Sequence, residues 1–196
     1  DYGIRFRRAD LGGLEIPARV EHVASLNYAT GLSFAGARVE TVEHLLAALA
    51  SQGIDNVLVE LSQPEVPIMD GSAAPFVYLI QEAGVRTLSV PRQYLRVHRP
   101  VALEQTDKRI ALYPSDSFKV TYSISFDHPL LRNQTRTVTI DEQVFTEEIA
   151  PARTFVYYED IAPLLEKGLI KGGTLEAAVV IRGETLLSKQ PLRFAA

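Results

Sequence analysis

The sequence predicts an α+β protein, built from two layered units of sheet and helix. Apolar side chains alternate strictly along residues 118–126, which is typical of a strand, whereas residues 42–49 place theirs at helical spacing. Between two helical patterns, residues 56–61 form a short β-branched run that fits a mostly buried strand. Because 46% of the 196 residues are hydrophobic and only 22% are charged, a folded core is expected rather than disorder.

The first helix is expected between Thr41, its N-cap, and Gly53, its left-handed C-terminal cap. Its apolar stripe is Val42, Leu45, Leu46 and Leu49. The strand at residues 56–61 follows, and Pro64 and Pro67 break the chain into a loop. This part therefore predicts a helix, a strand and a loop in that order.

A second helix is expected after the turn at Asp70–Gly71, with Ser72 as its N-cap and Pro75 tolerated in its first turn. Gly84 should end this helix. Its predicted apolar stripe is Phe76, Leu79, Ile80 and Ala83.

The character of the sequence changes near residues 88–92, so we predict one domain at 1–90 and another at 91–196. Residues 94–140 should be mostly strands, and the turn 127–129 should end the alternating run. The remaining predicted elements are a helix at 145–148, a strand at 154–158, a short helix on Ile161, Leu164 and Leu165 closed at 167–168, a turn at 172–173 and a buried strand at 177–181.

Composition and charge narrow the classes of function. A formal net charge of −4 disfavours a nucleic-acid-binding module, which is usually basic. Cysteine is absent, so no disulfide or thiolate ligand is expected. No apolar run approaches the roughly 20 residues that span a bilayer, so no membrane span is predicted. Residues 1–6 are typical of a strand inside a sheet and 191–196 of a strand end, so we expect a piece of a longer protein.

Glu43–His44 is the strongest candidate for chemistry, because it places a carboxylate beside an imidazole at the start of a helix. Imidazole is a common zinc ligand, and a neighbouring carboxylate can take a proton from a metal-bound water. Taken alone, the pair favours a plainer interpretation, in which Glu43 interacts with the helix dipole and His44 is an ordinary histidine.

Other acidic and histidine-containing segments also have structural explanations. Asp70–Gly71–Ser72 is sufficiently explained by a turn and a cap, although Asp70 could orient a group beside a metal site. Asp127–His128 is best explained by the end of a strand, and His22 and His98 by surface positions. The residues four positions after the histidines are Leu26, Ala48, Ala102 and Arg132, so the residues alone offer one credible metal ligand.

Four motifs in a fixed order carry a resemblance to a known family. They are 41–49 (Thr-Val-Glu-His-Leu-Leu-Ala-Ala-Leu), the turn at 64–73, 152–155 (Ala-Arg-Thr-Phe) and 167–175 (Lys-Gly-Leu-Ile-Lys-Gly-Gly-Thr-Leu). Together they closely resemble the UDP-3-O-acyl-N-acetylglucosamine deacetylases of lipid A biosynthesis, over nearly the whole chain. The resemblance implies a zinc amidase in the cytoplasm of Gram-negative bacteria, which removes acetate from the acylated UDP-sugar in the committed step of lipid A biosynthesis.

The resemblance also implies roles for individual residues. By similarity, His44 binds Zn²⁺, Glu43 is the general base and Thr154 stabilises the oxyanion. Phe155 corresponds to a substrate-contacting aromatic residue. The insert at about residues 156–181, a β-α-β unit, would form the passage for the acyl chain. Its apolar residues suited to that task are Ile161, Leu164, Leu165, Leu169 and Val179, and each also suits a plain core.

The sequence departs from the family at both ends. Family members begin with a further strand pair, and after the Leu-Arg-Phe seen at 192–194 they continue into helices that supply two more zinc ligands and a later histidine. With only His44 present, we expect these 196 residues alone to bind zinc poorly and to be inactive. The alternative is a non-catalytic binder of the acylated nucleotide sugar on the same scaffold. A monomer without nucleic-acid partners is expected in either case.

Overall fold

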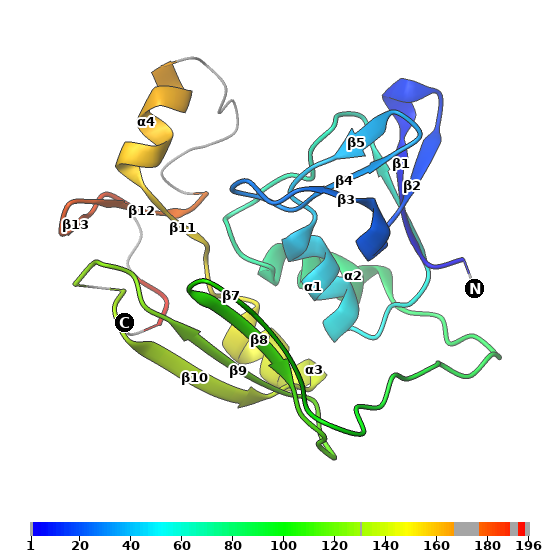
Figure 1. Ribbon diagram of the computed structural model, residues 1–196. Helices are drawn as coiled ribbons and strands as arrows, with labels where there is room; N and C mark the ends of the chain where they lie inside the picture. The colour runs from blue at the N-terminus through cyan, green and yellow to red at the C-terminus, as the bar shows by residue number, and fades with distance from the viewer. Residues whose placement is uncertain (1, 130, 167–176, 189–191, 195–196) are drawn as a thin grey trace.

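The computed structural model describes residues 2–129, 131–166, 177–188 and 192–194, and its mixture of small sheets and helices confirms the α+β class (Figure 1). The N-terminal part contains β1 (Ile4–Arg8), β2 (Leu14–Pro17), β3 (Val23–Ser25), β4 (Gly31–Phe34), β5 (Ala37–Val39), α1 (Glu43–Ser51), β6 (Val57–Leu61) and α2 (Ala74–Ala83). Residues 84–100 carry neither helix nor strand. The division into two domains stays a prediction.

The C-terminal part begins with two hairpins, which lie beside a helical segment in Figure 1. Its elements are β7 (Val101–Gln105), β8 (Lys108–Leu112), β9 (Lys119–Ile124), β10 (Gln134–Thr139), α3 (Glu142–Val144) with a π-helical turn at Phe145–Ile149, β11 (Phe155–Tyr157), α4 (Tyr158–Glu166), β12 (Val179–Arg182) and β13 (Thr185–Leu186). β11 pairs in parallel with β12 and α4 lies between them in sequence, so the predicted β-α-β unit is confirmed. The turns expected at 167–168 and 172–173 lie outside the described residues.

β1 is the central strand of its sheet, antiparallel to β2 and parallel to β6, in agreement with the prediction for the N-terminal segment. Phe6 and Ile16 are register partners and both are fully buried. The same core includes Val39, Leu45 and Leu49, and it extends to Phe145 in the C-terminal part. One apolar core therefore joins the two parts of the chain.

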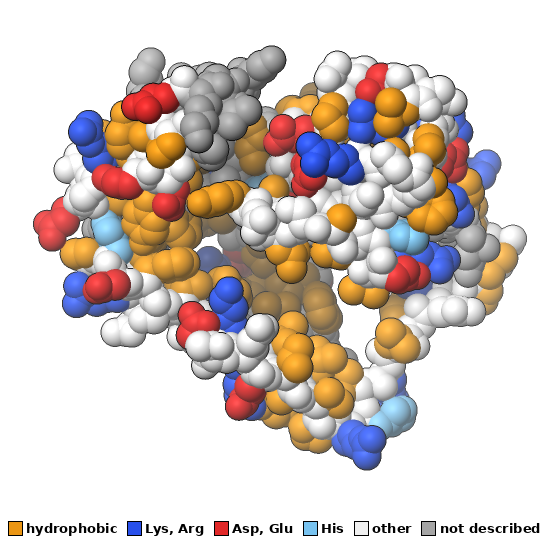
Figure 2. All heavy atoms as spheres, turned by 45° about the horizontal axis from the view of Figure 1, so that its top comes forward, with side chains coloured by type: hydrophobic (Ala, Val, Ile, Leu, Met, Phe, Trp, Pro, Cys, Tyr) orange, Lys and Arg blue, Asp and Glu red, His pale blue; other side chains and the backbone are white. Residues whose placement is uncertain are grey.

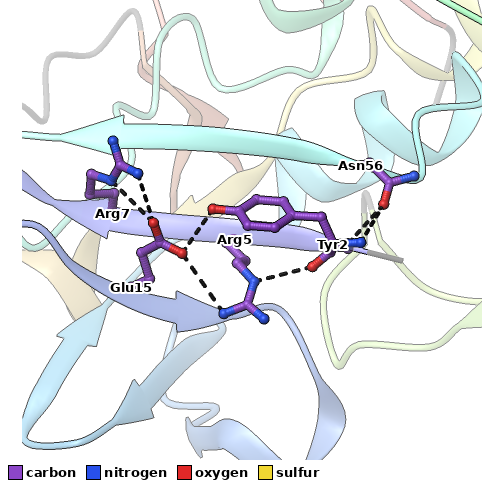
Figure 3. A network of polar contacts seen from close by, with 6 residues as sticks. Tyr2, Arg5, Arg7, Glu15 and Asn56 are labelled. Atoms are coloured by element: carbon purple, nitrogen blue, oxygen red, sulfur yellow. Dashed lines mark hydrogen bonds and ion pairs between the residues drawn. The ribbon is translucent and has the colours of Figure 1, made fainter.

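The polar face of β1 and β2 carries a network of ion pairs and hydrogen bonds (Figure 3). The Tyr2 hydroxyl and Arg7 both donate to the Glu15 carboxylate, at 2.8 Å each. Asn56 accepts from the Tyr2 backbone N–H at 2.9 Å, and Arg5 donates to the Tyr2 carbonyl. Hydrogen bonds from Arg7 and Tyr2 hold the pKa of Glu15 below its usual range. This network fastens the N-terminal residues to the sheet.

The helices agree with the predicted elements but not in every detail. Thr41 is not the N-cap of α1, since Val42 holds that position and the Thr41 hydroxyl bonds elsewhere. Gly53 is left-handed (φ 69°), as predicted. Ser72 accepts the Ala74 N–H at 3.3 Å, although the residue in the N-cap position of α2 is Ala73.

The predicted apolar stripe of α2 was partly wrong. Leu79 is 53% exposed and Ala83 is also exposed, whereas Val77 is buried beside Phe76. The helix therefore buries a face rotated by about one position from the predicted one. Every face of this helix is rich in apolar residues, so spacing alone did not select the buried side.

The alternating segment forms β9, as predicted, and pairs with β10 as an antiparallel hairpin. Part of its apolar face is exposed among the described residues, since Phe118 and Tyr122 are each 70% exposed. Figure 2 shows hydrophobic side chains at several parts of one face of the molecule and inside the hollow near its centre. In the described part of the chain, no helix is long and apolar enough to cross a membrane.

Candidate active site

Glu43 and His44 are the first two residues of α1, and both side chains are half-buried. The Glu43 carboxylate accepts a hydrogen bond of 3.0 Å from the Thr30 N–H. The Thr30 carbonyl in turn accepts the Val42 N–H at 3.3 Å. The start of α1 is thus held to the residue before β4, and this contact orients the Glu43 carboxylate.

The loop after β6 lies beside the start of α1. Glu40 and Glu65 form a parallel β-bridge, in which the Glu40 N–H bonds to the Pro64 carbonyl at 2.8 Å and the Val66 N–H to the Glu40 carbonyl at 3.0 Å. The Thr41 hydroxyl donates to the Glu65 carboxylate at 2.8 Å. The structure therefore brings the first two sequence motifs together.

Asp70 organises the turn that leads to α2. Its Oδ1 accepts hydrogen bonds from the Ser72 N–H at 3.1 Å and the Ser72 hydroxyl at 2.7 Å, and its Oδ2 accepts one from Arg193 at 2.7 Å. Burial of the Asp70 carboxyl raises its pKa, but the bonds from Arg193 and Ser72 outweigh burial and hold the pKa below its usual value. The carboxylate is therefore kept charged as the centre of this turn.

Gly71 allows the same turn to approach the C-terminal part closely. Its φ is 81°, a left-handed conformation that favours glycine, and a Cβ here would overlap the Ala177 carbonyl. The Gly71 carbonyl accepts the Thr154 N–H at 2.7 Å, and the Thr154 carbonyl accepts the Val179 N–H at 2.8 Å. The turn, the third motif and β12 thus meet at Gly71 and Thr154.

The predicted substrate-contacting residues have different environments. Phe155 begins β11, is half-buried and packs edge-to-face against Phe126, with their ring centroids 5.3 Å apart. Val179 is only 7% exposed, which suits the core interpretation left open above. Leu169 lies outside the described residues.

The candidate metal ligand His44 is not part of a recognisable metal site in the described residues. No group of three or more histidine, aspartate or glutamate side chains that could hold an ion occurs in those ranges. The described residues therefore do not by themselves fit a complete zinc site.

A groove of about 1010 Å³ lies between α1, the β9–β10 hairpin and the helical segment at 142–149. Ala47 and Ser51 contribute its α1 wall, and Tyr122 and Val138 line the hairpin side. His44 precedes Ala47 and Ser51 by three and seven positions, so all three share one face of α1. The groove is therefore lined by the face of α1 that carries His44, although His44 itself is not among its lining residues.

Sequence reasoning did not single out Arg193 or Glu65. Arg193 belongs to a short segment without periodicity, and its partner Asp70 is 123 residues away. Glu65 appeared only as one residue of the 64–73 turn, with no local sign that Thr41 would bond to it. Both contacts depend on the tertiary fold, so no local pattern could have indicated them.

Comparisons with known proteins agree with these motifs. The family model described as UDP-3-O-acyl N-acetylglycosamine deacetylase matches residues 1–196. A protein of Anaeromyxobacter dehalogenans is 48% identical over 99% of the chain, one of Teredinibacter turnerae is 44% identical over 99%, and one of Pseudomonas entomophila is 46% identical over 98%. Each relative is named UDP-3-O-acyl-N-acetylglucosamine deacetylase. The chain spans 63% of the first relative's length and 65% of that of the other two.

Proposed function

Because the chain belongs to the UDP-3-O-acyl-N-acetylglycosamine deacetylase family, we propose that the protein hydrolyses the N-acetyl group of UDP-3-O-acyl-N-acetylglucosamine, the committed step of lipid A biosynthesis. The observation that carries this proposal is 44–48% identity to deacetylases over at least 98% of the chain. The order of the four motifs supports it, and so does the meeting in the fold of the first three, at Thr41–Glu65 and at Gly71–Thr154.

In this proposal Glu43 is the general base that takes a proton from the attacking water. The Thr30 N–H contacts one carboxylate oxygen, which leaves the other oriented to receive that proton. Thr154 stabilises the negative charge that develops on the amide oxygen. Its backbone is fixed on both sides, by Gly71 and by Val179, which is what a preorganised donor requires.

Zinc is proposed only for the complete donor set, in which His44 would be one ligand. Zinc, when bound, would polarise the amide carbonyl of the substrate and make a water molecule more acidic. Because the described residues lack a three-donor group, the 196-residue chain alone is expected to bind zinc weakly and to be inactive. Tight, stoichiometric zinc in this chain together with acetate release would contradict that expectation.

The acylated nucleotide sugar is the proposed substrate. The half-buried Phe155 ring is suited to contact this substrate. Val179 is 7% exposed, so it is suited to pack beneath the residues that line the acyl passage rather than to touch the acyl chain. For Leu169 the proposal rests on the motif alone. We further propose a monomer in the bacterial cytoplasm, to be checked by light scattering and by fractionation of cells.

The decisive experiment measures acetate release from UDP-3-O-acyl-N-acetylglucosamine by mass spectrometry. It compares the 196-residue chain with the product of the complete reading frame that encodes it, each with and without a chelator. We expect the complete product to release acetate. The chelator should abolish this activity, and Glu43→Gln should reduce it at least about 100-fold. His98→Ala, at an exposed histidine, is the control and should retain activity. Substrate binding without acetate release would instead favour the non-catalytic binder.

A further inference from the structure

Arg193 links two segments that are distant in sequence. One nitrogen of its guanidinium, Nη2, donates to the Asp70 carboxylate at 2.7 Å. The other, Nη1, donates to the Pro151 carbonyl at 3.0 Å and to the Ser72 hydroxyl at 3.4 Å. A single planar group thus contacts both the turn at Asp70 and the segment just before Thr154.

The two segments are also joined directly. The Ala150 carbonyl accepts the N–H groups of Ala73 and Ala74 at 3.0 Å each, and the Gly71 carbonyl accepts the Thr154 N–H at 2.7 Å. These backbone bonds join residues 71–74 to residues 150–154, and the Arg193 guanidinium joins the same two segments through side-chain bonds. Movement of the turn would therefore carry the Thr154 backbone with it.

We propose that Arg193 is a positioning residue, which holds the Asp70 turn and the 150–154 segment together and so fixes the place of Thr154. This inference rests on the proposed function, in which Thr154 stabilises the oxyanion. Small displacements of such a donor reduce catalysis strongly, because its hydrogen bond must reach the place where charge develops.

The solvent exposure of the pair argues for a local rather than a global effect. The Arg193 and Asp70 side chains are 30% and 34% exposed, and exposed ion pairs contribute little to overall stability. Arg92 provides a matched control, since it contacts the Asp55 carboxylate at 2.8 Å and also bonds to the Gly53 carbonyl. Its side chain is 38% exposed, so the two arginines have similar exposure. They differ mainly in the segments that they contact, since Arg92 does not contact the Asp70 turn or the segment before Thr154.

The first test is hydrogen exchange of backbone amides in the 196-residue chain, followed by NMR. In Arg193→Met the Thr154 amide should exchange at least about tenfold faster and its amide resonance should shift, because local opening becomes easier. In Arg92→Met the exchange rate of the Thr154 amide should stay within about twofold of the parent, and its resonance should not shift. Arg193→Lys keeps the charge but cannot reach three acceptors at once, so an intermediate rate is expected. An unchanged Thr154 amide in Arg193→Met, or an equal change in Arg92→Met, would overturn the inference.

Asp70→Asn provides a second variant should Arg193→Met fail to fold. It removes the charge that Arg193 contacts with little change of shape, and it should also speed exchange at Thr154. Exchange as slow as in the parent would count against the proposal.

A kinetic test separates this inference from the proposed function. In a complete product that deacetylates, Arg193→Met should lower kcat at least about tenfold while KM stays within about twofold. Arg193→Lys should restore part of kcat. A change in KM alone would overturn the positioning role. If the parent does not deacetylate at all, the proposed function fails and the exchange result alone decides whether Arg193 holds Thr154.

Discussion

The Thr41 hydroxyl donates a 2.8 Å hydrogen bond to the Glu65 carboxylate and thereby ties the start of α1 to the loop after β6. Thr41 is 6% exposed and its φ is 61°, so a β-branched residue is held here in a left-handed conformation. Such a conformation is costly for threonine and persists only where the surroundings determine it. The contact with Glu65 is one such determinant, and it lies two residues before Glu43.

Removal of this hydroxyl should destabilise the chain measurably. Thr41→Val keeps the shape of the side chain but leaves the Glu65 contact unmade, so we expect a loss of about 1 kcal/mol in the free energy of unfolding. Thr41→Ser retains the hydroxyl and should stay closer to the parent. Urea unfolding followed by circular dichroism measures both values. Equal stabilities for the two variants would show that the hydrogen bond contributes nothing.

Gly71→Ala should be far more damaging than the same change at Gly36. The two glycines have nearly the same φ, 81° and 82°, so the conformational cost of an alanine is matched at about 1–2 kcal/mol. Only at Gly71 would the new Cβ overlap a backbone carbonyl, that of Ala177, whereas nothing lies within 4 Å at Gly36.

We therefore expect Gly71→Ala to lose at least about 2 kcal/mol more than Gly36→Ala and to disturb the Thr154 amide. Differential scanning calorimetry and an NMR spectrum of each variant test this expectation. Similar melting temperatures for the two variants would contradict the close approach at Gly71.

Asp70 should make the free energy of unfolding depend weakly on pH in the acid range, through its bonds to both Ser72 and Arg193. Because the folded protein holds the pKa of Asp70 below its usual value, the unfolded state binds the proton more readily. The stabilisation is therefore present above the unfolded pKa of about 4 and is lost as pH falls through the lower folded pKa.

The contribution of Asp70 appears as the difference between the parent and Asp70→Asn. Their unfolding free energies should differ at pH 7 and should converge as the pH falls below about 4, since other carboxylates titrate equally in both. Urea titrations at several pH values measure this difference. A gap that stays constant down to about pH 2 would contradict the linkage.

Strong local periodicity predicted α1, α2 and β9 but none of β2 to β5, and tertiary contacts decided several details of the predicted elements. The alternation at 118–126 and the helical spacing after Thr41 each correspond to an observed element. Thr41 was predicted as an N-cap because its residue type favours that position, yet its hydroxyl bonds to Glu65, 24 residues further along the chain. Local propensity cannot rank such a partner against the helix terminus.

The candidate site was predictable to a similar extent. Ordered motifs singled out Glu43, His44 and Thr154, and the structure joins Thr154 to the turn at Gly71. The link through Arg193 was not predictable, because a single arginine 123 residues from Asp70 leaves no pattern in the sequence. The roles of Glu43, His44 and Thr154 in chemistry stay predictions.

The apolar face of β9 gives the last prediction. Phe118 and Tyr122 are each 70% exposed and line the groove beside α1, so the 196-residue chain should bind the hydrophobic dye ANS. Tyr122→Thr keeps a residue that favours strands and removes the ring, and it should reduce dye fluorescence at least about twofold. Lys119→Thr, on the opposite face of β9, is the control and should leave fluorescence unchanged. Equal dye binding by the parent and Tyr122→Thr would mean that this face is not the accessible apolar surface, and the groove would then have to be closed in solution.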